Sequence, residues 1–365
     1  MHKDIVPLSD KDQLLGGLRC GTRFYAASIA TARNRLSTPD QYYDHQSDFD
    51  RQARAGISPG IVDSDTLKQL YIGYVENQVL EWDEFEILAL KQIVGSMNLR
   101  YRQIPDFRLP EIVYLVKTTG YEEGAAAYTR QLDTIVLPLN MISSIRKYAN
   151  DGDPLHPAHV TAYLESIVTH ESFHVFSKNA DLNTAVTDRS TLKQRLYKSI
   201  GYNMTSNDVV LPDVGWPFDQ SVGKMNEFRI TNPDSPRLAS YVEMNTPSHG
   251  QQKLMPLLMA SGVYNGGAFF NYLEWYMMAV EEQRGVWQAV MRADHNPLLF
   301  RMDNDDNPHM KEEYLSLVGY NLSGEIFQAD EVLAQNFVKL LTRDLPSPWV
   351  LSNIAKAFEG PSHFS

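Results

Sequence analysis

Thiols are nearly absent from this chain of 365 residues, in which Cys20 is the only cysteine. An intrachain disulfide framework and a cysteine-rich zinc knuckle are therefore excluded, because each needs several thiols. Long hydrophobic runs are also lacking, since no stretch reaches the roughly 18 apolar residues of a membrane span. The N-terminal residues are charged throughout and show no apolar segment of signal-peptide length. We expect a cytoplasmic protein without a membrane span, with non-classical export as the alternative.

Positive charge is in deficit. The chain has 33 Lys and Arg against 45 Asp and Glu, which gives a formal net charge of −12, and no polybasic run occurs. Neutralising nucleic-acid phosphates or an anionic membrane requires a basic face, so we expect neither partner. The hydrophobic content of 43% is ordinary for a globular protein. A chain of this length can bury a large core, as one domain or as two parts.

Helical patterns dominate the first part of the chain. Residues 12–36, 63–80 and 81–98 each carry apolar residues at helical spacing, and Asp63 or Ser64 is suited to cap the second of these helices. We therefore predict a helical N-terminal layer over residues 1–105.

The pattern changes after residue 106. Runs of β-branched and aromatic residues at 110–120 and 125–142 flank the glycine-containing segment 120–124, which predicts a hairpin. Residues 205–290 are rich in Pro, Asn and Gly and are predicted to be mostly strand and loop. Two helices follow, broken at Pro346 and Pro348. The second part, residues 106–365, is thus predicted to be an α+β domain with a β-rich insertion at 205–290.

The sequence "HESFH" at residues 170–174 carries the chemistry. It lies in an apolar stretch with helical periodicity over 158–177, so His170 and His174 project from one face, one turn apart. We expect that face to be buried. Two imidazoles at this spacing suit zinc, whose bonds to imidazole nitrogen are roughly 2.0–2.1 Å. Glu171 lies on the neighbouring stripe, where it could act on a metal-bound water without ligating the metal.

Together with the preceding strand "AAAYTRQLDTIVLP", this motif resembles the zincin zinc metallopeptidases. The resemblance implies a small sheet whose edge strand lies above an active-site helix, Zn2+ as cofactor, and hydrolysis of peptide bonds in a peptide or protein substrate. It further implies Glu171 as the catalytic base and Ala126, Ala127 and Tyr128 as edge-strand residues that pair with the substrate. The continuation "VFSKNADLN" lacks the Gly and third His of the metzincins, which leaves a gluzincin-like pattern.

In that pattern a later helix supplies the third ligand. Glu331, in "IFQADEVLAQNFVKLL", is our choice because it would lie in the first turn of an amphipathic helix, close to the small residue Ala334. An acidic residue that merely stabilises a helix N-terminus is the alternative interpretation. The other candidates for the third ligand are Glu274, Glu282, Glu227 and Glu243.

Further polar residues have less specific patterns. Asn336 could orient a metal ligand, although an ordinary helix asparagine is equally compatible with the pattern. In the segment 228–237, Asn232, Asp234 and Arg237 could meet a substrate, but Asn-Pro-Asp favours a simple turn. The candidates for stabilising an oxyanion are Tyr241, His249 and Tyr320.

Two other functions fit the same residues. A zincin-like protein could retain the metal site without catalysis and act as a binding protein. A metal-dependent hydrolase could act on a non-peptide amide. Retention of Glu171 favours catalysis, because a purely structural metal site has no need of a base.

Overall fold

The structure is a computed structural model that describes residues 9–60, 62–104, 106–150, 156–182, 187–217, 222–303, 307–320, 327–342 and 347–359. The fold is α+β. Two compact units can be distinguished: Met1–Asp40 with Ile72–Asn179, and Gln41–Tyr71 with Ala180–Ser365. Within the described ranges, no helix combines the length and apolar character that crossing a membrane requires.

The first unit combines a mixed sheet with long helices. Its elements are β1 (Gln13–Gly17), β2 (Arg23–Ala26), α1 (Ile29–Ser37), β3 (Val79–Leu80), α5 (Glu84–Arg100), η1 (Tyr101–Gln103), β4 (Ile112–Thr118), η2 (Tyr121–Glu123), β5 (Tyr128–Arg130), β6 (Thr134–Pro138), α6 (Leu139–Asn150) and α7 (His156–Leu182). Helix α4 (Ser64–Asn77) runs across the division between the units.

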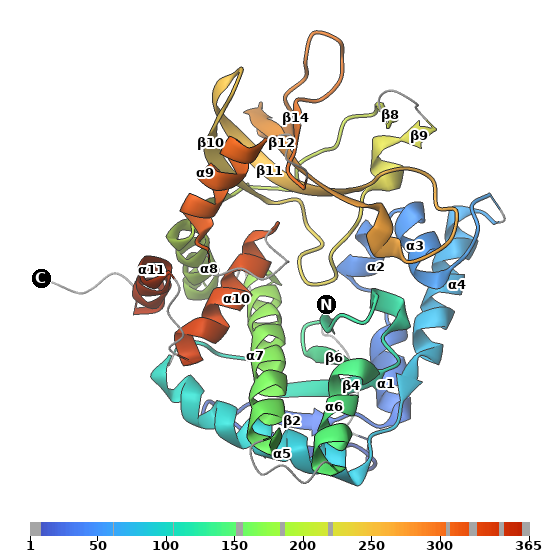
Figure 1. Cartoon of the computed structure of the whole chain (residues 1–365), viewed down its shortest axis with the longest axis vertical. Coiled ribbons are helices and arrows are strands. Elements are labelled where there is room, and N and C mark those ends of the chain that lie inside the picture. The colour runs from blue at the N-terminus through green and yellow to red at the C-terminus, as the bar shows by residue number, and fades with distance from the viewer. Residues whose placement is uncertain are drawn as a thin grey trace, which may run out of the picture. The chain divides into compact units, whose positions relative to one another are not determined.

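The sheet of the first unit has the strand order β1-β2-β4-β6-β5, with β3 paired to β4. Strands β2, β4 and β6 are parallel, whereas β1, β3 and β5 join them antiparallel. The central strand β4 is buried along most of its length. Figure 1 shows α6 and α7 on the same side of these strands. Strand β5 is last in the strand order and forms one edge of the sheet.

The helix predicted over residues 12–36 is wrong. Two strands, β1 and β2, precede a shorter helix, α1. Gly16 explains part of the difference, because a Cβ atom at this position would lie 3.0 Å from Val94 Cγ1 on α5. The backbone of β1 can thus approach α5 closely. Residues 1–105 are accordingly not a purely helical layer, since β1, β2 and β3 belong to the same sheet as β4.

The hairpin predicted across residues 120–124 is also wrong. Strands β4 and β6 are parallel neighbours, and the hairpin is formed by β5 and β6. Gly120 has a φ of +87°, and a Cβ atom there would lie 2.6 Å from Pro138 Cβ. The glycine-containing segment therefore leads the chain past the end of β6 to the sheet edge. Apolar runs buried on both faces are typical of parallel strands, but their composition does not reveal their partner.

The second unit is built on an antiparallel sheet. Its elements are α2 (Gln41–His45), α3 (Asp48–Ala55), α8 (Thr187–Ser199), β7 (Tyr202–Met204), β8 (Gly215–Trp216), β9 (Gly223–Lys224), η3 (Met225–Phe228), β10 (Ser240–Thr246), β11 (Gly250–Ala260), η4 (Phe269–Tyr272), β12 (Leu273–Gln283), β13 (Val286–Ala289), β14 (Leu299–Arg301), α9 (Pro308–Val318), α10 (Ala329–Thr342) and α11 (Pro348–Glu359).

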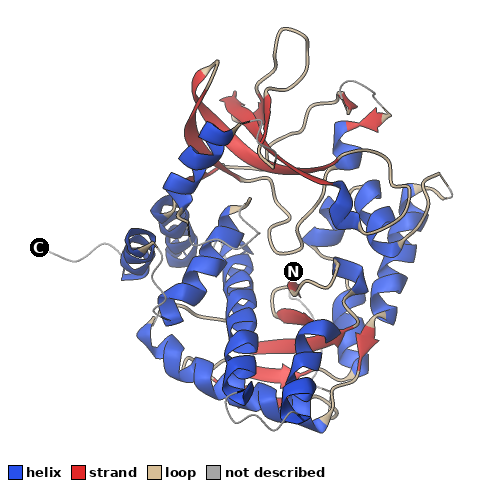
Figure 2. Cartoon of the chain, viewed as in Figure 1, coloured by secondary structure: helices blue, strands red, loops and turns tan. Residues whose placement is uncertain are grey.

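Most of the strands in this unit form one curved sheet, which Figure 2 shows in red. The strand order is β13-β12-β11-β10-β7, with β14 paired to β12. Residues 205–290, where strand and loop were predicted, supply its three longest strands. Helices α8, α10 and α11 pack against one another.

A buried carboxyl group in the first unit makes stability depend on pH. Glu122 is fully buried in η2, and its Oε1 accepts a hydrogen bond of 3.1 Å from the Tyr128 hydroxyl. Burial raises the pKa of the Glu122 carboxyl above its ordinary value of 4.5. The folded state therefore holds this proton at a pH where the unfolded chain has lost it.

We predict that the free energy of unfolding is highest below the unfolded pKa of Glu122 and falls as pH rises through its higher folded pKa. The variant Glu122→Gln keeps an acceptor for Tyr128 but cannot ionise. Its stability relative to the wild type should therefore increase between about pH 5 and about pH 8. Urea unfolding at both pH values measures this change, and an identical pH response of the two proteins would contradict the prediction.

Candidate metal centre

Helix α7 carries the motif and is held along its length by other parts of the first unit. Near its N-terminal half, Glu165 Oε1 pairs with Arg100 Nε of α5 at 2.8 Å. Near its C-terminal end, Asn179 Nδ2 donates to the Leu132 carbonyl at 2.6 Å. Attachment at these two points restricts rotation of the helix about its axis, so the side chains between Glu165 and Asn179 have a defined direction.

An aromatic cluster holds the middle of α7. Phe173 lies within the motif and Phe176 two residues after it, and both are buried. Phe107 lies 5.0 Å from Phe176 and 5.0 Å from Tyr101 between ring centroids. Aromatic side chains of this size contribute much of the buried area of a core. The phenylalanines of the motif and its continuation therefore pack the helix into the core of the first unit.

The two histidines lie together as the spacing predicts. His170 Nε2 and His174 Nε2 are 3.0 Å apart, and the ring centroids are separated by 4.7 Å. Two ligands of one tetrahedral zinc ion, each at roughly 2.0–2.1 Å, would be about 3.3 Å apart. The observed separation is close to this value. Without an ion the same spacing suits an N–H···N hydrogen bond, whose donor depends on the tautomers.

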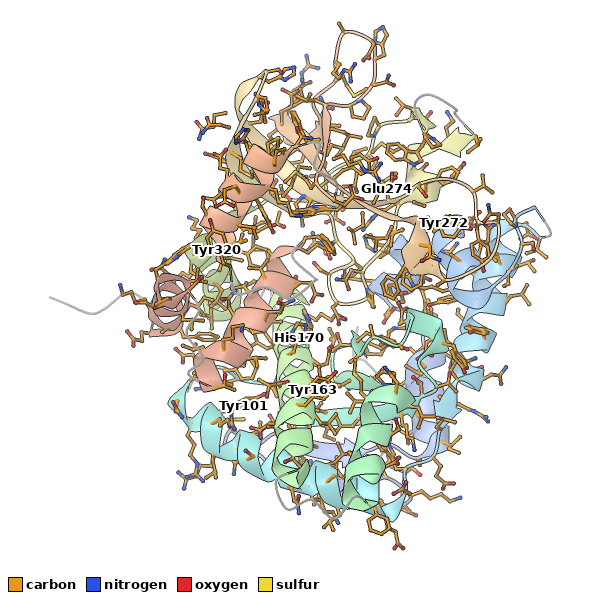
Figure 3. The ribbon with its side chains drawn as sticks, viewed as in Figure 1. Tyr101, Tyr163, His170, Tyr272, Glu274 and Tyr320 are labelled. Carbon is orange, nitrogen blue, oxygen red and sulfur yellow. The ribbon has the colours of Figure 1, made fainter. Side chains whose placement is uncertain are left out.

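Burial differs from the prediction for this face. His174 is fully buried and His170 only partly, whereas Tyr163, further along the same stripe, is 50% exposed. Figure 3 shows His170 and Tyr163 at different heights on α7. The expectation that the whole histidine face is buried is therefore wrong, since the stripe becomes more exposed toward its N-terminal end. A ligand pair with one accessible member suits a centre that must admit a substrate.

Glu171 lies on the buried stripe beside the histidines. Its side chain is 4% exposed, and Leu164 and Val168 on the same stripe are fully buried. A carboxylate in such surroundings is costly to desolvate unless other groups stabilise its charge. Its position next to His170 and three residues before His174 is the one expected of a base that works beside a metal.

In the second unit, Glu331 lies in the first turn of α10, as expected from the sequence, and is 2% exposed. Its Oε1 accepts a hydrogen bond of 2.7 Å from Asn232 Nδ2. Asn336 is buried on the same helix, but its Nδ2 donates to the Val332 carbonyl at 2.8 Å. The role of Glu331 as third ligand stays a prediction.

The segment containing Asn232 forms a turn whose side chains also make specific contacts. Asp234 N donates to Asn232 Oδ1 at 2.8 Å, which is the Asx turn favoured by the sequence. Arg237 Nε donates to Asp208 Oδ1 at 2.8 Å. The turn explanation is thus sufficient for Asp234, whereas the Asn232 side chain also reaches Glu331.

Helix α3 anchors this segment, which the sequence did not reveal. Ser47 Oγ donates to the Arg229 carbonyl at 2.6 Å, and Thr231 N donates to Asp50 Oδ2 at 2.9 Å. Ser47 and Asp50 form the capping box of α3. Their spacing could have identified a helix start, but it carries no information about a contact more than 180 residues away in sequence.

The other candidate ligands have different surroundings. Glu274, labelled in Figure 3, is paired with Arg301 at 2.8 Å and accepts from the Tyr276 hydroxyl at 2.8 Å. The remaining candidates are exposed: Glu227, Glu243 and Glu282. Of the five glutamates considered from the sequence, only Glu331 is buried.

The candidates for stabilising an oxyanion all lie in the second unit. Tyr241 stacks on Trp287 with ring centroids 5.1 Å apart. Tyr320, which Figure 3 labels, donates its hydroxyl proton to Glu312. His249 is exposed, with its ring 6.3 Å from that of Phe300. These contacts favour structural roles for Tyr241 and Tyr320 and do not select a donor.

The expected substrate-binding residues lie at the sheet edge. Ala126 and Ala127 are partly exposed just before β5, whereas Tyr128 is 2% exposed and directs its hydroxyl to Glu122. The Tyr128 side chain thus belongs to the core. Any contact of this segment with an extended ligand would use backbone groups.

Comparisons with known protein families, with curated proteins and with solved structures find no match to this chain. The case for a metal centre accordingly depends on the residues themselves and on their geometry.

We predict that His170→Ala abolishes tight zinc binding, because one imidazole cannot replace two. Zinc content after dialysis should fall from about one equivalent to a small fraction of this, and the rise in melting temperature on adding zinc should disappear. The exposed residue His249 offers a matched control, since His249→Ala should keep both properties. Full zinc content in His170→Ala would show that the pair is not a metal centre.

Proposed function

We propose that this protein is a zinc-dependent hydrolase of peptide bonds with a zincin-like catalytic unit. The observation that carries the proposal is the 3.0 Å separation of His170 Nε2 and His174 Nε2 on a helix that also presents Glu171. An i, i+4 pair of imidazoles with a glutamate beside the first is the arrangement used by zinc peptidases of the H-E-x-x-H type. The packing of α7 in the first unit supports it by fixing the direction of these side chains.

The donor set fits zinc better than the hard cations. Two imidazole nitrogens suit zinc and related transition metals, whereas calcium and magnesium take oxygen ligands. When bound, zinc would act as a Lewis acid and lower the pKa of a coordinated water toward neutrality. His170 and His174 would hold the ion, and as third ligand we propose Glu331.

Glu171 is proposed as the group that moves protons. Its carboxylate would accept a proton from the attacking water and later deliver that proton to the nitrogen of the leaving amine. Burial favours this role, because a carboxylate shielded from bulk water exchanges its proton with the reacting groups. The rigid helix would keep its carboxyl oxygens at a constant position relative to both imidazoles.

Two features of the first unit support a zincin-like arrangement. The sheet is mixed, with β5 as an antiparallel edge strand, and the chain continues from the β5–β6 hairpin through α6 to the motif helix. The edge of a sheet is a common site for binding an extended peptide. This combination of an edge strand and a motif helix is the one implied by the sequence resemblance.

The environment of Glu331 supports its proposed role. Metal-ligating carboxylates are themselves held by hydrogen bonds from neighbouring groups. Asn232 Nδ2 donates to Glu331 Oε1, and the backbone on either side of Asn232 is held by Asp50 through Thr231 N and by an Asx turn at Asp234 N. One carboxylate oxygen of Glu331 is thereby oriented within its own unit.

The proposed mechanism predicts that Glu171→Gln binds zinc normally but loses hydrolysis. A general base contributes about 10²–10⁴-fold, so kcat on a peptide substrate should fall by this factor. Metal analysis and a peptide-cleavage assay on the same preparation measure the two properties. Unchanged turnover in a zinc-loaded Glu171→Gln protein would sink the mechanism, and a matching loss of zinc would assign Glu171 a structural role.

If Glu331 is the third ligand, a change in the residue that hydrogen-bonds to it should weaken zinc binding. Asn232→Ala should weaken zinc binding about 10–100-fold, because loss of such a supporting hydrogen bond typically has this effect. Exposed Asn245 donates from Nδ2 to Glu313 at 3.1 Å and so forms a comparable Asn–Glu pair, which makes Asn245→Ala the control. Competition with a chromophoric chelator measures the zinc affinity of each. Equal affinities for Asn232→Ala and the wild type would remove the support for Glu331.

A further inference from the structure

The outward backbone groups of the edge strand β5 are mostly occupied by side chains of the same unit. In an antiparallel pair, successive residues alternate between directing their backbone groups to the partner strand and away from it. The Thr129 carbonyl accepts from Lys178 Nζ at 3.0 Å, and Gln131 N donates to Asp40 Oδ2 at 3.1 Å. Residues 129 and 131 therefore face away from β6.

One step beyond the strand toward the N-terminus, this alternation leads to Ala127. Before it, Ala125 has a φ of +69° and belongs to the turn that precedes β5. The Ala125 carbonyl accepts from Asn140 Nδ2 at 3.3 Å. For Ala127, the described residues provide no hydrogen-bond partner to either its N–H or its C=O, and the residue is partly exposed. Ala127 is thus the position at which this edge is open between capped neighbours.

The side chains that occupy the backbone groups of residues 125, 129 and 131, which we call caps, include the charged groups of Lys178 and Asp40. Asp40 also receives two hydrogen bonds from Arg130, from Nε at 3.0 Å and from Nη2 at 3.1 Å. Burial raises the pKa of the Asp40 carboxyl, but the charge and hydrogen bonds of Arg130, with the Gln131 amide, bring it below its ordinary value. Lys178 Nζ additionally donates to Thr129 Oγ1 at 2.6 Å. A peptide would have to displace ionised groups to extend its pairing from Ala127 toward Thr129 and Gln131, and the neutral amide of Asn140 to extend it toward Ala125.

Lys178 also relates the strand to the histidines. It follows His174 by four residues on α7, so it projects from the same face, about 6 Å further along the helix axis. The face that presents the imidazoles thus carries the ammonium group that caps Thr129. The limit on strand pairing and the candidate metal centre therefore share one helix face.

We propose that β5 pairs with an extended peptide at Ala127 alone, that Lys178, Asp40 and Asn140 set this limit, and that the substrates are accordingly short peptides rather than long extended segments. The inference rests on the proposed function for its statement about substrates. A single residue offers one N–H and one C=O, enough to align a short peptide but not to bind a strand by a continuous ladder.

The test compares binding of a tripeptide and a decapeptide that share a central sequence. Zinc-loaded Glu171→Gln protein is used so that neither peptide is consumed, and affinities are measured by calorimetry. We expect equal affinities, since the additional residues find no backbone partner. Hydrogen exchange should show protection of the Ala127 amide by both peptides.

Removing a cap should make the protein bind the decapeptide more tightly than the tripeptide. Lys178→Met, made in the same background, frees the Thr129 carbonyl and should raise the affinity for the decapeptide about tenfold without changing that for the tripeptide. Asn140→Ala, at an exposed position, frees the Ala125 carbonyl and should act in the same direction even if Lys178→Met fails to fold. Lys68→Met, which removes a partly exposed lysine paired with Asp44, is the control.

Three results would overturn the inference: tighter binding of the decapeptide by the starting protein, an unchanged affinity ratio in both cap variants, or no protection of the Ala127 amide. The proposed function is tested separately by hydrolysis with the wild type. Expected binding ratios without hydrolysis would refute only the proposed function. Hydrolysis with a marked preference for the decapeptide would refute only the limit on length.

Discussion

The attachment of α7 to the rest of its unit is the constraint on which the candidate site depends. Arg100 pairs with Glu165 in the N-terminal half of α7, and the cluster around Phe173 and Phe176 packs further along the helix. Asn179 binds the β5–β6 hairpin near the C-terminal end. Because these contacts restrict rotation of the helix, the direction in which it presents the two imidazoles is fixed within the first unit. Catalytic and metal sites require such support, because misplacement of a ligand by even an ångström weakens the chemistry.

The same helix face serves the sheet edge. Lys178 on α7 donates a hydrogen bond to the Thr129 carbonyl. Asp40 accepts hydrogen bonds from Arg130 and Gln131 at the end of β5. Buried or half-buried charges carry a desolvation cost, which the hydrogen bonds from Lys178 and the Asp40–Arg130 ion pair offset. Here they close most of an edge that would otherwise pair with another chain, which is a common protection against aggregation. Ala127 is the interruption in that protection.

The second unit prepares a carboxylate in a different way. A short turn around Asn232, held by the capping residues of α3, places an amide donor against Glu331 at the start of α10. Negative charge is favourable near a helix N-terminus, so the position suits Glu331 with or without a metal. The hydrogen bond from Asn232 is the feature that an ordinary N-terminal glutamate would not need.

Several features of this protein could be predicted from local sequence patterns alone. The motif helix, the spacing of His170 and His174 and the helical start of α10 follow from periodicity of a few residues. Only the tertiary structure decided between strand and helix for residues 12–36, placed β4 beside β6, and brought Lys178 to Thr129. These outcomes depend on partners distant in sequence, since a strand gains its hydrogen bonds from another strand, whereas a helix makes its own. The sequence therefore identified which residues could hold a metal, and tertiary packing determined how they are supported.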